Sequence, residues 1–349
     1  VNVTINGVPL NDSESHGVFW VNLPDIASSV DNIQIQRGVG PSTNGAGAFG
    51  ATVGLKTNYI YQNPFVEASG SYGSFNTKRM SVKFGTGLIN DKYTIEGRYS
   101  KITSDGYIDR ATSDLNSFYF SAAKIEENHS LRINVFSGNE RTYQSWYGTP
   151  ESKVNGDIEE LTNHYNRNKG GAYEVARDST NLFDSGRSYN YYTYANQIDD
   201  YAQTHAQFIY NAKTSEKMNV NITGHYTRGK GFFEQLKRDQ EYADYLFGPL
   251  ILTGNDSVFS GDLVRRKWLD NHFYGVIANA QYQVNDDLEI LLGAGANRYD
   301  GGHYGRPVFA FVRDTFRVLD PALRDVENDP PFNYYENNGT KDDINLFLR

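Results

Sequence analysis

The chain has 349 residues and a net charge of −9, with 33 Gly, 26 Tyr, 20 Phe and no Cys. Without cysteine, disulfides and thiolate metal sites are excluded, and the acidic balance argues against a nucleic-acid partner. No run of 18 apolar residues could form a transmembrane helix, but a mean hydropathy of −0.61 also fits a membrane barrel, in which only alternate residues face lipid.

Residues 1–57 differ from the rest of the chain. They contain short apolar runs at 1–5 and 33–35, followed by a glycine-rich stretch at 38–50 that permits tight turns. This stretch has neither the spacing of a dinucleotide fingerprint nor the Lys-Ser/Thr pair of a P-loop, so no phosphate site is predicted. No signal peptide precedes Val1, and both ends resemble interrupted strands, so we expect the chain to be cut from a longer protein.

From about residue 60 the apolar residues alternate with polar ones, which predicts strands with one apolar and one polar face. Val82 and Phe84 alternate with Ser81 and Lys83, for example. Most of these segments run for 11 or 12 residues, close to the roughly 9–11 that cross a bilayer at the usual tilt. The predicted strands are 63–73, 77–88, 92–102, 115–125, 129–139, 198–212, 217–228, 270–284, 287–298 and 343–349.

The connections between these strands alternate in length. Tight turns such as Asn90-Asp91 and Asn285-Asp286 alternate with long polar loops at 103–114, 140–197, 229–269 and 299–342, and only the first hairpin, at 74–76, is short on the long side. Short turns at one end and long loops at the other are typical of an outer-membrane barrel. A soluble sandwich, the alternative all-β reading, does not predict this alternation.

Three segments of residues 1–57 resemble the second half of the plug domain of TonB-dependent outer-membrane receptors. Residues 5–11, INGVPLN, are similar to the family's IDGVPLN strand and turn, with Asn6 in place of the usual Asp. Residues 23–24 with 33–38, LP and IQIQRG, are similar to its LP…IEVLRGP element. Residues 44–57 are similar to its YGSGAFGGVINIIT close. The sequences of the glycine-rich stretch and of residues 72–76 most resemble those of receptors from Bacteroidetes.

The resemblance implies an all-β fold, in which a plug fills a transmembrane antiparallel β-barrel of 22 strands. Residues 1–57 are expected to form the C-terminal half of the plug, and residues 58–349 the first ten barrel strands. The family's function implies active import of a nutrient across the Gram-negative outer membrane, most often an iron complex such as a siderophore or haem. Cobalamin, a glycan or a peptide are alternative cargoes, and a passive porin or structural barrel is an alternative class.

The expected partners are the TonB-ExbB-ExbD complex, reached through a TonB box absent from this chain, outer-membrane lipid, a small-molecule substrate and, for some cargoes, a surface lipoprotein. No nucleophile–base pair or metal-ligand spacing is present, so we predict neither an enzyme nor a cofactor. Glu96 and Arg98 lie on one face of a strand and are interpreted as a structural ion pair. Arg37 is interpreted as a buried plug charge held by barrel carboxylates. The predicted structural plug residues are Gly7, Arg37, Gly38, Gly45, Gly47 and Gly50.

In the family, the turn after the IDGVPLN strand touches substrate. Here that turn mixes hydrogen-bonding side chains with two aromatics, which suits a ligand with polar and flat apolar parts. Its predicted ligand contacts are Asp12, Ser13, Glu14, Ser15, His16, Phe19 and Trp20, although the two aromatics could instead anchor the plug core. Trp146 and Tyr147 of the loop 140–197 are further predicted contacts, because clustered aromatics supply rigid contact area. Tyr191 to Tyr194 are assigned to an aromatic girdle or the loop base.

Overall fold

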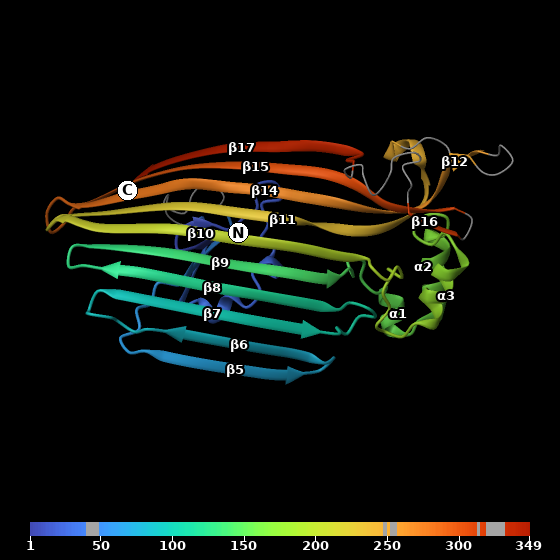
Figure 1. Cartoon of the computed structure of the whole chain (residues 1–349), viewed down its shortest axis with the longest axis horizontal. Coiled ribbons are helices and arrows are strands. Elements are labelled where there is room, and N and C mark those ends of the chain that lie inside the picture. Colours follow the sequence, from blue (N-terminus) through green and yellow to red (C-terminus); the bar gives the residue numbers. More distant parts are fainter. Residues whose placement is uncertain (40–48, 247–249, 252–256, 313–314, 319–331) are drawn as a thin grey trace.

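The computed structural model describes residues 1–39, 49–246, 250–251, 257–312, 315–318 and 332–349. Its main element is a curved antiparallel wall of long strands (Figure 1). The long strands are β5 (Phe65–Gly73), β6 (Thr77–Gly85), β7 (Tyr93–Ser104), β8 (Ser113–Ile125), β9 (His129–Tyr143), β10 (Ile198–Ser215), β11 (Met218–Glu241), β14 (Ser260–Gln283), β15 (Glu289–Val312) and β17 (Tyr335–Leu348).

Each of the ten predicted strands is present, and each pairs with its neighbour along the chain. The wall stays open, because β5 and β17 are its two edges; the short strand β16 (Thr315–Val318) pairs only with the end of β15. Tight turns close several hairpins, and Asn90 and Asp91 between β6 and β7 both have positive φ, the conformation that suits the twist of a two-residue hairpin turn. None of the helices in the described residues is long and apolar enough to cross a membrane.

The two faces of the wall differ in chemistry. On the outward face, apolar side chains stand free of any cover, including Ile222, Val276 and Leu292, which are 39%, 52% and 53% exposed. The inward face of the same strands carries polar residues such as His225 and Thr227. An apolar outward band with a polar interior is the pattern of a barrel that faces lipid.

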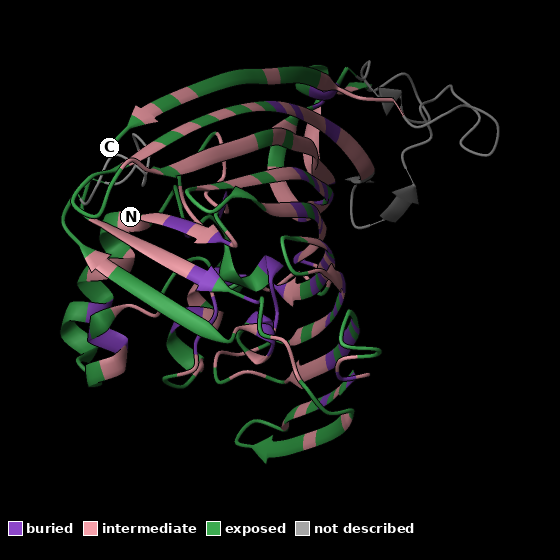
Figure 2. Ribbon diagram, turned by 90° about the vertical axis from the view of Figure 1, so that its left-hand side faces the viewer, coloured by how far each residue is buried: buried purple, intermediate pink, exposed green. Residues whose placement is uncertain are grey.

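A small sheet made from the first 57 residues lies on the inward side of the wall (Figure 2). Its strands are ordered β2 (Val8–Pro9), β1 (Asn2–Ile5), β4 (Ala51–Lys56) and β3 (Asn32–Arg37), and β1 pairs with β4 in parallel. Two short 3-10 helices, η1 (Trp20–Asn22) and η2 (Ile26–Ser29), connect β2 to β3. We refer to residues 1–57 as the plug segment.

One hydrophobic cluster joins the plug segment to the wall. Ile5, Leu23, Ile26 and Leu55 from the plug segment pack with Tyr119 of β8 and Phe136 of β9, all less than one-tenth exposed. Gly138 of β9 makes this approach possible, because a Cβ there would lie 2.3 Å from the Asn22 carbonyl oxygen and 2.4 Å from Pro24 Cδ. The plug segment is therefore packed onto the wall through a shared core.

The loop between β9 and β10 is not the irregular segment that its polar sequence suggests. It contains three helices, α1 (Glu151–Asn155), α2 (Ile158–Asn168) and α3 (Ala176–Asp184), which lie together at one end of the wall (Figure 1). Leu161 of α2 and Leu182 of α3 form a separate buried cluster with Tyr173 and Tyr189. This helical loop therefore has a core of its own.

Candidate functional site

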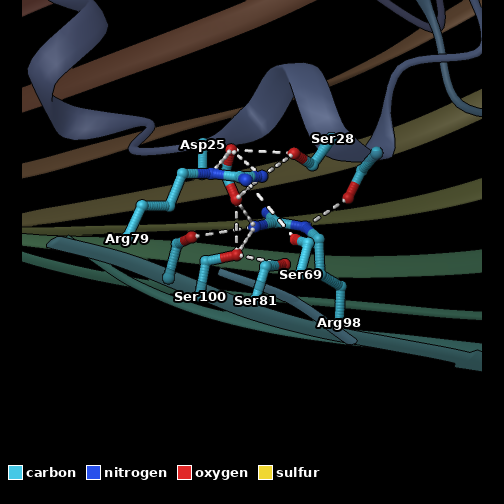
Figure 3. A network of polar contacts seen from close by, with 9 residues as sticks. Asp25, Ser28, Ser69, Arg79, Ser81, Arg98 and Ser100 are labelled. Atoms are coloured by element: carbon cyan, nitrogen blue, oxygen red, sulfur yellow. Dashed lines mark hydrogen bonds and ion pairs between the residues drawn. The ribbon is translucent and has the colours of Figure 1, made fainter. Parts of the chain in front are cut away.

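The seam between the plug segment and the wall centres on Asp25 (Figure 3). Both carboxylate oxygens accept hydrogen bonds from Arg79 of β6, at 3.0–3.1 Å, and Oδ2 also accepts from Arg98 of β7 at 3.2 Å. Ser100 donates to Asp25 Oδ2 at 2.5 Å. The guanidinium of Arg98 is held in turn by Ser29 Oγ at 2.7 Å. The plug segment is thus tied to two adjacent strands through one carboxylate.

This environment keeps Asp25 ionised. Burial alone would raise its pKa, but hydrogen bonds from Ser100, Ser28 and Arg79 and the charge of Arg98 outweigh burial and lower the pKa. The predicted ion pair between Glu96 and Arg98 is wrong as to its partner. Both side chains are buried on the inward face, and the ion pair of Arg98 is with Asp25 instead, because the plug segment brings a carboxylate directly over it.

Asn6, which stands where the family has Asp, makes a contact that Asp could not make. Its amide nitrogen donates to Gln207 Oε1 of β10 at 2.9 Å, and its Oδ1 accepts from the Thr57 amide at 3.0 Å. Gln207 in turn donates to the Ile5 carbonyl at 3.1 Å. An ionised carboxylate accepts hydrogen bonds but does not donate them. Asp at this position could therefore not donate to Gln207, whereas Asn6 does.

The predicted structural plug residues fall in three groups. Gly7 and Gly38 have φ of +86° and +79°, which favours glycine, and the Gly38 amide donates to the Gly50 carbonyl at 2.9 Å. Gly45 and Gly47 lie outside the described residues. Arg37 lies exposed at the end of β3, the edge strand of the plug sheet, so its burial by carboxylates of further barrel strands stays a prediction.

The predicted ligand contacts at 12–16 form a closed turn at the tip of the plug segment. Asp12 Oδ1 accepts from the amides of Glu14 and Ser15 at 3.1 and 2.7 Å and from Ser15 Oγ at 2.8 Å. The tip also touches the wall: Glu14 lies 3.0 Å from His303 Nε2 of β15, and the Ser13 carbonyl accepts from Lys341 Nζ at 3.4 Å.

The remaining predicted contacts of the plug segment are exposed to solvent. Phe19 and Trp20 are 54% and 49% exposed, so neither is an anchor of the plug core, and His16 is exposed with φ of +58°. A small cavity of about 40 Å³ lies behind the tip, between residues 9–13 and the inward side chains of β10, β11, β14 and β15. His205 and Tyr299 line that cavity, and each has a buried polar atom with no partner among the described residues.

Trp146 and Tyr147 line a larger pocket of about 460 Å³ beneath the helical loop. Trp146 Nε1 donates to Asp199 Oδ2 at 3.2 Å, and its ring packs edge-on against Phe233. The Tyr147 ring lies 4.9 Å from that of Tyr191. Tyr191, Tyr192 and Tyr194 line the same pocket, so the structure places these tyrosines beside the two predicted contacts and not only at a loop base.

Two charged residues of this pocket lie outside the predicted strands. Lys237 and Arg238 line it from β11, in residues that the sequence pattern places in the loop 229–269. β11 in fact continues to Glu241, β14 begins at Ser260 and β15 extends to Val312. The longer strand could have been recognised from the two-residue spacing on its inward face, which continues through Gly229, Gly231, Phe233 and Gln235.

No protein-family model matches the chain, and no curated protein is similar to it in sequence. Solved structures do match it in fold. The open form of the ferric-catecholate import receptor Fiu from E. coli K12 aligns with a TM-score of 0.66 at 15% identity, over 99% of this chain and 49% of that one. The ferric citrate transporter FecA gives 0.61 at 12% identity (99% and 44%). The pyoverdine receptor FpvA from Pseudomonas aeruginosa PAO1 gives 0.60 at 10% (99% and 46%).

These likenesses confirm the predicted fold, part of a transmembrane antiparallel β-barrel with part of its plug. At such identities they concern the fold alone. The chain spans about half the length of the structures that it matches.

Proposed function

We propose that this protein lies in the outer membrane of a Gram-negative bacterium and imports an iron complex, such as a siderophore or haem, with energy from the TonB-ExbB-ExbD complex. The observation that carries the proposal is the plug segment, which packs on the polar inward face of a wall whose outward face is apolar. Such a segment obstructs passive flux, so passage of cargo requires work on it. The fold neighbours, whose names specify ferric catecholates, ferric citrate and pyoverdine, support iron complexes as the cargo class.

The ligand would meet two surfaces in this chain. The first is the pocket beneath the helical loop, with Trp146 and Tyr147 on its aromatic side. The second is the plug tip, with Asp12 to His16 and the exposed rings of Phe19 and Trp20. Aromatic rings with adjacent hydrogen-bonding groups bind ligands that combine flat apolar and polar parts. We assign initial capture to the pocket and the later contact to the plug tip.

The test is uptake by cells that express the protein from its natural reading frame. In a strain lacking its own iron receptors, we expect growth under iron limitation on at least one ferric siderophore or on haem, and loss of that growth when TonB is deleted. Growth only on cobalamin, glycans or peptides would move the protein to a different cargo. TonB-independent uptake, with sugar flux into liposomes while the plug is present, would contradict the proposal and favour a passive barrel.

A further inference from the structure

Three cationic side chains lie at one end of the wall, on its inward face. Gln235 of β11 pairs with Arg265 of β14, and Lys267 lies two residues along β14 on the same face. Lys237 follows Gln235 by two residues on β11 and so shares that face. Further along the same two strands and on the same face, Thr227 and Phe273 line the cavity behind the plug tip. This identifies the face as the inward one. We call Lys237, Arg265 and Lys267 the cation cluster.

The cation cluster is not neutralised by carboxylates within the described residues. Arg265 donates to two neutral groups, Tyr245 Oη and Gln235 Oε1, each at 3.2 Å, and its buried Nε has no partner there. Lys237 and Lys267 make no ion pair among the side chains that the structure describes. Lys267 Nζ lies 5.8 Å from the centre of the Tyr335 ring.

The opposite face of the same strands behaves differently. There Arg228 and Lys230 both pair with Asp270, and Arg266 pairs with Glu234 at 2.8 Å. Like charges held together without counter-ions repel one another, and the chain as a whole carries a net charge of −9. A group of inward-facing cations that form no ion pair with a carboxylate of the described residues therefore points to an anion that comes from outside the chain.

Three nearby carboxylates do not remove this excess. Glu174 lines the same pocket as Lys237 but forms no ion pair with it in the described part of the chain. Asp199 lies in the same row of the wall as Lys267, two strands away, and accepts hydrogen bonds from Trp146 and Gln144. Asp178, also in the pocket, is paired with Arg238.

The cation cluster is also continuous with both proposed ligand surfaces. Lys237 lines the aromatic pocket together with Trp146 and Tyr191. At the other side, Lys267 pairs with Gly305, and the next inward position on β15 is His303, which touches Glu14 of the plug tip. A ligand moving from the pocket to the plug tip would pass over the cations.

We propose that the cargo of this receptor is a polyanionic chelate, and that Lys237, Arg265 and Lys267 bind its carboxylate or catecholate oxygens while the pocket aromatics contact its flat parts. This inference rests on the proposed import function and deepens it. Arg provides paired donors for such oxygens, and Lys provides a point charge. A neutral chelate of the same size would leave the three charges unpaired and would bind more weakly.

Binding to the purified protein, produced from its natural reading frame in detergent, tests the proposal. The probes are ferric citrate and a ferric tris-catecholate, both anionic, and a neutral ferric trihydroxamate of similar size. Calorimetry or quenching of tryptophan fluorescence gives the dissociation constants at two salt concentrations. The test variant is the double substitution K237Q/K267Q. The matched control is K230Q, which removes a lysine from the outward face of the same strand. Circular dichroism and thermal unfolding of each variant establish that it is folded.

We expect an anionic chelate to bind at least about tenfold more tightly than the neutral one, with an affinity that falls with salt. K237Q/K267Q should lose at least about tenfold of that affinity, and K230Q should lose little. Equal binding of both chelate classes, or an anionic affinity indifferent to the double variant, overturns the inference but leaves iron import standing. No binding by any probe overturns both.

Discussion

Replacement of Asp25 by Asn removes one negative charge from between two arginines. Arg98 is 3% exposed, so after the substitution its guanidinium remains buried beside an amide that partly repels it. Removing one partner of a buried ion pair costs about 3–5 kcal/mol, because the other charge is left uncompensated. We expect the docking of the plug segment on the wall to weaken by this amount, without loss of the barrel strands.

Hydrogen exchange of the plug amides measures this loss. Each 1.4 kcal/mol is tenfold in an equilibrium constant, so the protection of amides in η2 and β3 should fall by about 100-fold to several thousand-fold. The amides of β8 and β9 should keep their protection. The matched control is Asp200→Asn, which breaks the exposed pair with Arg141 on the outward face. An exposed pair of this kind contributes about 0–1 kcal/mol.

A loss at Asp25→Asn no larger than that of the control would refute the argument, because it would mean that the buried seam stabilises the plug no more than a surface pair. A second variant checks the cause. Combining Asp25→Leu with Arg98→Met removes both charges of the buried pair and leaves only the partly exposed Arg79, so we expect it to be less destabilised than Asp25→Leu alone. If the double variant is as unstable as the single one, then lost packing and not an uncompensated charge explains the effect.

Three further predictions follow from the contacts of the plug and the helical loop. Asn6→Asp should weaken plug docking by about 1–3 kcal/mol in hydrogen exchange, because a carboxylate would face Gln207 Oε1 with no donor; unchanged protection would argue against the match. Gly138→Val should open the seam to protease, since its Cβ has no room beside Asn22, whereas Gly148→Val meets no atom and should not. The Asp178 pKa is lowered because hydrogen bonds from Arg238 and two backbone amides outweigh burial, which raises it. The resulting stability is present above the ordinary value of 3.8 and is lost as pH falls through the lowered pKa, so α3 should stay protected at pH 5 and be released only in stronger acid.

Much of the wall was predictable because strand alternation is a local property of the sequence. The apolar side chains of Val82, Phe84 and Tyr99 lie exposed on the outward face of the wall. Their polar neighbours along each strand face the plug segment. Tight turns such as Asn90-Asp91 carry their own conformational signature. Ten strands could therefore be located from period and turns alone, and the plug motifs supplied the segment that fills the interior.

The ends of the long strands beside the helical loop could not be located in the same way. β11 and β14 run past the apolar band into residues that carry charges on both faces, where Glu234 and Arg266 lie outward and Lys237 and Arg265 lie inward. Alternation of apolar and polar residues disappears there, although the hydrogen-bonded ladder continues. The partner of Arg98 was also beyond reach, since Asp25 is 73 residues away in the chain and is brought to β7 by the plug fold.

The contacts that hold the plug segment differ in strength from the seam to the tip, and the difference bears on the proposed import. At the seam, Asp25, Arg98 and Gly138 make a buried, close-packed junction whose rupture costs several kcal/mol. At the tip, the side chains of Glu14 and His303 are 42% and 24% exposed, so their contact contributes little. A ligand that reaches the tip from the cation cluster therefore competes with the weak contact and not with the strong one. We expect it to rearrange residues 12–16 while the body of the plug stays docked, which leaves displacement of the plug to an external source of energy.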